Sequence, residues 1–184
     1  MKKVEFEGSV EFAMTTGMVP WGDHSEFAHT IEGTALAFTD SYNEEEAGRV
    51  TLRLVSVTEV INRGESLHLV CDADSAVLEA AYWALFDEKG ETKEDLDIEP
   101  GWNSLLYIES IEAEPEYQET TLAVRLIETA IAIFCSDGLV IAVEEAFDLT
   151  IEEWRQLGFK RIAGSEFVFR DQLRVNPYGE GSAD

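Results

Sequence analysis

The stretch that decides the fold is "LLYIESIEAEPEYQETTLAVRLIETAIAIFCSDGLVIAV", residues 105–143. Two apolar runs, at 103–114 and 138–146, flank a segment whose apolar residues recur at helical spacing: Leu122, Leu126, Ile127, Ala130, Ile131 and Phe134. A strand, a crossover helix and a second strand are typical of parallel neighbours in one sheet. We therefore predict that the two strands are parallel, with a buried helix at 120–134 between them.

The segment that follows predicts a second helix and a closing hairpin. In "TIEEWRQLGF" (150–159), Thr150 is the expected N-cap, Glu153 completes a capping box, and Gly158 ends the helix. The runs "KRIA" (160–163) and "EFVFRD" (166–171) are expected to form two short strands. Residues 175–184 are polar and are expected to form a flexible tail.

The first half of the chain is expected to be rich in strands. Alternating or apolar runs predict strands at 3–12, 29–38, 49–57 and 66–73, separated by a loop at 15–26 and an acidic turn at 43–48. A helix is expected at 76–88, with Asp74 or Ser75 as its cap. The chain as a whole is expected to be one α/β (α+β) domain over residues 1–174. It should contain a mixed, mostly antiparallel sheet flanked by helices, with extra strands in residues 1–50.

Composition excludes several classes of function. The 184 residues carry 38 acids against 13 bases, a formal net charge of −25, which repels nucleic acids and anionic membrane surfaces. With no long apolar segment, the protein is expected to be cytoplasmic. Cys71 and Cys135 are expected to be buried rather than paired, and the spacing of Asp23, His24 and His29 fits no common zinc pattern, so no metal is expected.

From Leu105 to Phe169, the order of strand, loop, helix, strand, helix and strand resembles the core of the GNAT superfamily, the acyl-CoA-dependent N-acetyltransferases. The resemblance extends to residues 67–173 if the preceding segments are included. It implies a GNAT-like fold, acetyl-CoA as cofactor and an amine as acceptor, with the acidic surface favouring a cationic substrate.

The cofactor motif of that family is Gln or Arg, two residues, Gly, one residue, then Gly or Ala. Gln118 and Ala123 match it, whereas Thr121 stands in place of glycine and Glu119 brings a carboxylate to a place where the resemblance implies a pyrophosphate. Glycine matters there because backbone N–H groups at a helix N-terminus hold the anion at close range. The resemblance implies that the cofactor contacts would come from Ile111, Ala113, Gln118, Glu119, Thr120, Thr121, Leu122 and Ala123.

For catalysis, the resemblance implies a carboxylate base from the strand at 103–114, which points to Glu109 and Glu112. Glu109 is either that base or one exposed acid among many. The tyrosine that often protonates the leaving thiolate is replaced by Trp154, whose indole is no practical acid. Two functions therefore stay open: an acetyl-CoA-dependent N-acyltransferase, or a GNAT-like module that has lost catalysis and binds a partner, such as a basic protein.

Overall fold

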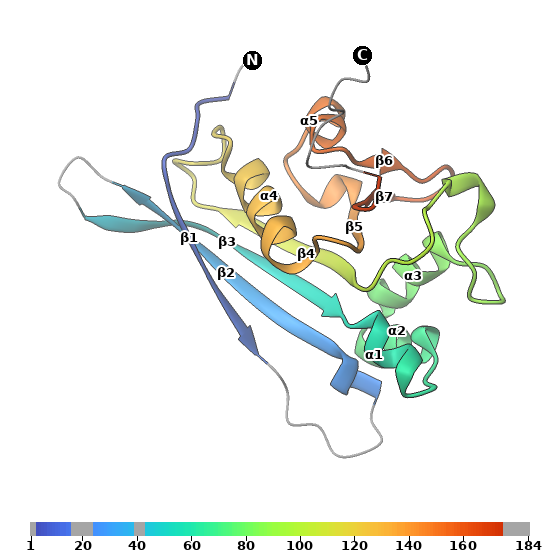
Figure 1. Ribbon diagram of the computed structural model, residues 1–184. Coiled ribbons are helices and arrows are strands. Elements are labelled where there is room, and N and C mark those ends of the chain that lie inside the picture. Colours follow the sequence, from blue (N-terminus) through green and yellow to red (C-terminus); the bar gives the residue numbers. More distant parts are fainter. Residues whose placement is uncertain (1–2, 16–23, 39–42, 175–184) are drawn as a thin grey trace, which may run out of the picture.

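The computed structural model describes residues 3–15, 24–38 and 43–174 (Figure 1). Its strands and helices have these bounds: β1 Gly8–Thr15, β2 Ala28–Phe38, β3 Glu44–Val55, α1 Val57–Asn62, α2 Leu67–Asp74, α3 Ala76–Leu85, β4 Leu105–Ala113, α4 Leu122–Phe134, β5 Leu139–Val143, α5 Ile151–Gln156, β6 Lys160–Arg161 and β7 Phe167–Asp171.

All seven strands join one mixed sheet in the order β1-β2-β3-β4-β5-β7-β6. The only parallel pair of this sheet, within the part of the chain that the structure describes, is β4 with β5. The predicted parallel pair around α4 is thus confirmed, as are the mostly antiparallel character of the sheet and the extra strands at the N-terminal side.

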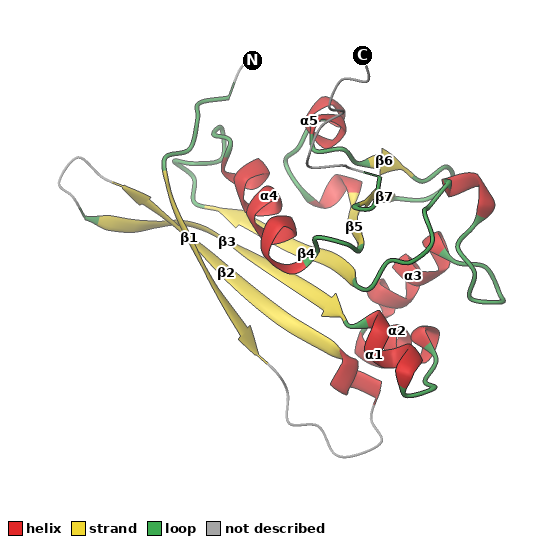
Figure 2. Ribbon diagram, in the orientation of Figure 1, coloured by secondary structure: helices red, strands yellow, loops and turns green. Residues whose placement is uncertain are grey.

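Helices cover both faces of the sheet (Figure 2). Because successive side chains of a strand point to opposite faces, β4 contributes to two cores. Leu106 and Ile108 lie in a core with residues of α4 and α5, and Leu105 and Tyr107 lie in a second core with residues of α1, α2 and α3. Both cysteines are buried and free, and burial raises the pKa of Cys71 to about 12 and that of Cys135 to about 11.

A β-bulge in β4 changes which side chains face α4. Thr51 of β3 pairs with Ser110 and Leu52 pairs with Ile108, which leaves Glu109 without a partner on β3. The extra residue shifts the alternation by one, so that Ile111 and Ala113 pack on the α4 side with Ile108. This end of β4 therefore contributes to the cavity described below.

Several predicted elements are confirmed and others were wrong. Ser75 caps α3, and the capping box of α5 is present, with Thr150 Oγ1 accepting a hydrogen bond from Glu153 N. The segment at 66–73 was predicted as a strand but forms α2, which buries Val70 and Cys71. The strand predicted at 3–12 begins only at Gly8, where β1 starts. The acidic turn predicted at 43–48 is mostly strand, because β3 begins at Glu44. α1 had not been predicted.

Two predictions on local structure lie largely or wholly outside the described residues. Most of the loop at 15–26 and the whole tail at 175–184 belong to this part of the chain. No helix among the described residues has the length and apolar character that a membrane crossing requires.

Candidate functional site

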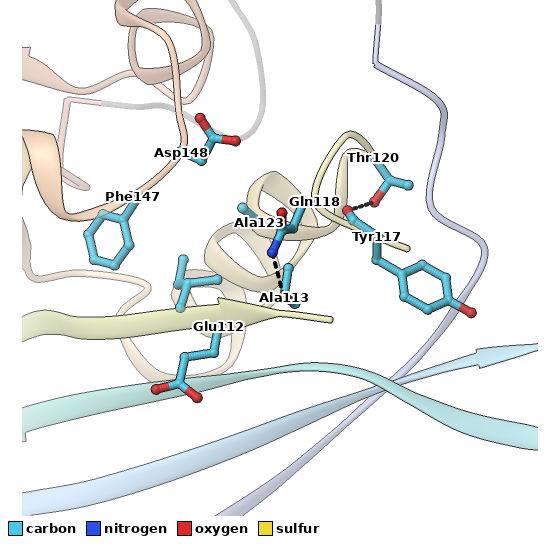
Figure 3. A pocket seen from close by; sticks show the side chains of 9 residues that line it. Glu112, Ala113, Tyr117, Gln118, Thr120, Ala123, Phe147 and Asp148 are labelled. Carbon is cyan, nitrogen blue, oxygen red and sulfur yellow. Dashed lines mark hydrogen bonds between the residues drawn. The ribbon is translucent and has the colours of Figure 1, made fainter. Parts of the chain in front are cut away.

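A cavity of about 430 Å³ lies beside the C-terminal half of β4 (Figure 3). Its wall consists of this half of β4, the loop and first turn that lead into α4, and the two residues that follow the short 3-10 helix after β5. The lining residues are Ile111, Glu112, Ala113, Tyr117, Gln118, Thr120, Ala123, Phe147 and Asp148.

The cavity exists because β4 and β5 stop pairing before β4 ends. Their last pair is Ile108 with Ala142, yet β4 continues to Ala113. After Val143 the chain leaves the sheet in a 3-10 helix over Glu144–Ala146. Among the described residues, the second half of β4 thus has no neighbouring strand on this side, and the bulge turns Ile111 and Ala113 toward the opening.

Five of the eight predicted cofactor residues line this cavity: Ile111, Ala113, Gln118, Thr120 and Ala123. Glu112, one of the two predicted bases, is also among the lining residues. The Gln118 side chain lies across the opening and donates from Nε2 to the carbonyl oxygen of Ala113 at 3.4 Å (Figure 3). The sequence therefore located most of this cavity wall.

The other three predicted cofactor residues do not line the cavity. Leu122 is fully buried in the core. Glu119 is exposed, and its carbonyl oxygen accepts a hydrogen bond from Val4 N at 3.3 Å. The hydroxyl of Thr121 accepts a hydrogen bond from Phe6 N at 2.9 Å. Glu119 and Thr121 thus hold the N-terminal segment of the chain.

Three backbone N–H groups around the start of α4 are used within the protein. Thr120 N donates to Tyr117 O at 3.0 Å, and Thr121 N donates to Val4 O at 2.9 Å. Leu122 N donates to Thr120 Oγ1 at 3.2 Å. A helix N-terminus binds an anion through N–H groups that lack an internal partner. Three of the groups around this N-terminus already have one.

The charge of the cavity does not favour an anion either. Its nine lining residues include two acids, Glu112 and Asp148, and neither Lys nor Arg. The carboxylate of Glu112 points to the other side of β4 from Gln118 (Figure 3). Lys3 reaches the neighbourhood, but its Nζ donates to Asp148 O at 2.9 Å and pairs with Glu153 Oε1 at 3.0 Å.

Glu109 lies outside the cavity, on the bulge, and is held by an arginine. Its Oε2 accepts a hydrogen bond of 2.8 Å from Arg53 Nε, and Arg53 Nη1 lies 3.7 Å from Asp74 Oδ1. The hydrogen bond to Glu109 raises the pKa of Arg53 despite partial burial, so the guanidinium stays charged. The two predicted bases, Glu109 and Glu112, are therefore not brought together in one cavity.

Trp154, which stands where the resemblance implies a proton donor, is a core residue. It is 2% exposed, packs edge-on against Phe147 and Phe159, and donates from Nε1 to Glu144 O at 3.3 Å. These contacts account for its side chain without a catalytic role.

Three lining residues were not predicted: Tyr117, Phe147 and Asp148. Tyr117 Oη donates to Glu45 Oε1 at 2.5 Å, and this hydrogen bond, with partial desolvation, raises the pKa of Tyr117 to about 12. Phe147 and Asp148 come shortly after β5. Their signal in the sequence was position, because residues that follow the second of two parallel strands lie at the same edge of the sheet as those that follow the first.

Comparison with known proteins gives no relative: no family model, no curated protein and no solved structure matches the chain. Among the described residues, no group of three His, Cys, Asp or Glu side chains is arranged to hold a metal ion. Asp23 lies outside those residues, whereas His24 is described, with Nδ1 3.4 Å from Glu65 Oε2.

Proposed function

We propose that this protein is a GNAT-like binding module that has lost the acyl-CoA reaction. The single observation that carries the proposal is the use of the N–H groups of Thr120, Thr121 and Leu122 within the chain. A pyrophosphate that used the N–H of Thr121 would have to displace the N-terminal segment, and it would meet no cation among the lining residues of the cavity. A basic protein is the partner that the net charge of −25 favours, and the cytoplasm is the expected compartment.

A specific observation also favours a second candidate, an acetyl-CoA-dependent N-acyltransferase that acts on an amine. The cavity lies where the parallel strands stop pairing, and five of the residues implied as cofactor contacts line it. Under this alternative, Ala113 and Ile111 would border the acyl chain, and Glu112 would be the base only after its carboxylate turned from the other side of β4.

Titration calorimetry and thermal unfolding with acetyl-CoA separate the two functions. The binding module is expected to show no heat of binding and no shift of the unfolding midpoint. A ligand present at about a hundred times its Kd would stabilise the folded state by about 2.7 kcal/mol.

A pair of variants makes the test specific to the cavity. Ala123→Glu places a carboxylate on the cavity wall, and Ala132→Glu places one on an exposed position of the same helix. Binding of acetyl-CoA to the wild-type protein and to Ala132→Glu, with loss in Ala123→Glu, would establish the acyltransferase cavity and overturn the proposal.

A further inference from the structure

Among the strands that the structure describes, β1, with eight residues, is an edge of the sheet and pairs with β2 on one side only. Phe38 N donates to Glu7 O, one residue before β1. Hydrogen-bonded pairs alternate along an antiparallel ladder, so Ser9, Glu11 and Ala13 bond to β2. The N–H and C=O groups of Gly8, Val10, Phe12 and Met14 therefore point outward. Among the described residues, none bonds to them from that side.

The outer edge has one apolar and one acidic side. Val10 and Phe12 pack against the core on the α4 side, and Met14 is 54% exposed next to them. Phe12 meets Phe134 of α4 edge-on, with ring centroids 5.2 Å apart. A cavity of about 280 Å³ lies at the start of β1, between Val10 and α4, and its lining is mixed: Phe6, Gly8, Val10, Arg125 and Thr129.

The opposite side of the same edge is acidic. Glu7 and Glu11 are exposed, and Glu32 of β2, which pairs with Ala13, is exposed one strand further in. No cation of the described residues forms an ion pair with these three carboxylates. An added strand would thus meet apolar side chains on one face and unpaired acids on the other.

We propose that β1 receives an extended segment of a basic partner protein as an eighth strand, with Lys or Arg alternating with apolar residues. The outward backbone groups of β1 supply the hydrogen bonds, and the side chains at alternate positions select the sequence. Apolar side chains of the partner lie beside Val10 and Phe12, and its cations lie beside Glu7 and Glu11. A second copy of this chain fits less well, because it would add its own glutamates and another net charge of −25. This proposal rests on the proposed function as a binding module.

The experiment uses the full chain and a labelled nine-residue peptide in which lysine alternates with valine, followed by fluorescence anisotropy. We expect binding that weakens with salt and falls about tenfold in Glu7→Lys/Glu11→Lys. The control Glu91→Lys/Asp95→Lys changes the net charge equally at exposed residues of another loop and is expected to alter the affinity by about twofold at most.

Two analogues of the peptide test the backbone hydrogen bonds on the wild-type protein. One is N-methylated at every valine and the other at every lysine. An added strand presents only one of these sets to β1, valines if it runs antiparallel and lysines if it runs parallel, so one analogue is expected to lose binding and the other to keep it. Equal affinities of the two analogues, or no binding of the parent peptide, would overturn strand addition.

Sedimentation of the wild type and of Val10→Pro tests whether a second copy of this chain pairs with β1 instead. Proline at an outward-facing position of an edge strand is tolerated but removes a donor. A dimer that Val10→Pro abolishes would assign the edge to a second copy and overturn the proposal. The acetyl-CoA titration stays independent: binding there overturns the proposed function, whereas failure of the peptide alone overturns strand addition.

Discussion

Among single residues, Thr121 is the one whose role in the structure differs most from the role that the sequence suggested. In the sequence it stands where a glycine would admit an anion, and in the structure its hydroxyl and its N–H both bind the N-terminal segment. Replacing it by valine keeps the shape but leaves Phe6 N without an acceptor. We expect Thr121→Val to lower the free energy of unfolding by about 1 kcal/mol in urea denaturation.

Thr121→Ser is the matched control, since it keeps the hydroxyl, and its urea midpoint is expected to stay close to that of the wild type. Equal midpoints of the valine and serine variants would show that water replaces the hydroxyl and that this hydrogen bond does not hold the N-terminal segment.

The ionisation of two tyrosines makes the stability of the folded state depend on pH in the alkaline range. The hydrogen bond to Glu45 raises the pKa of Tyr117 to about 12, and burial, with the charges of Glu109 and Glu166, raises that of Tyr107 to about 12. An unfolded chain releases these protons near pH 10. The folded state therefore holds more protons between pH 10 and 12, so stability is fully present below pH 10 and is lost as the pH rises toward 12.

The measurement is urea unfolding across this range, with tyrosinate absorbance followed in parallel. Tyr107→Phe and Tyr117→Phe should each make the decline of stability with pH less steep. An absorbance titration of the folded protein that is complete near pH 10 would contradict both assignments.

At the level of elements, α4 is expected to contribute most to stability on its side of the sheet. Leu126 and Ile127 are fully buried in the core, whereas Ile133 of the same helix is 57% exposed. Leu126→Ala and Ile127→Ala should each lower the free energy of unfolding by about 2–5 kcal/mol. Ile133→Ala, the control, should change it little, and similar losses in all three variants would mean that the exposed side of α4 is also packed.

Elements with a strong period or a clear cap were predictable from the sequence, and short apolar runs were not. The apolar residues of α4 at helical spacing and the capping box of α5 each identify a helix from local sequence alone. The run at 66–73 is as short as a strand, and its buried pair, Val70 and Cys71, fits either class. The bulge at Glu109 left no pattern that sequence reasoning detected, because it is defined by the partner strand.

The residues of the candidate site were also predictable where the pattern is local, and not where distant segments meet. Gln118 and Ala123 were found because a motif fixes their spacing, and Phe147 and Asp148 were missed because the fold, not the spacing, brings them to β4. The bonds of Thr121 to residues 4–6 join segments 115 residues apart and could not be read from either segment alone.

For the whole molecule, the dominant physical property is its charge. The chain has 38 acids and only 13 bases, so the excess carboxylates repel one another in the compact state. Raising the ionic strength from about 0.01 to about 0.15 M shortens the screening length from about 30 to about 8 Å. We therefore expect the thermal midpoint to rise with sodium chloride over this range.

The control for this prediction is Glu44→Lys/Asp95→Lys, two exposed acids reversed at once, which should raise the midpoint at low salt and flatten its dependence on salt. A midpoint that is independent of salt in both proteins would show that local ion pairs already compensate the net charge.

The hydrogen bonds of Val4 and Phe6 to residues 119–121 also set the order in which a growing chain can be completed. Phe6 and its partner Thr121 are separated by 115 residues in the sequence. At synthesis rates of about 5 to 20 residues per second, about 6 to 23 s pass between them on the ribosome. Loop closure over such a distance comes late, since its entropic cost precedes any gain from contacts. Val4 and Phe6 therefore complete these contacts only after β1 to β4 have been synthesised.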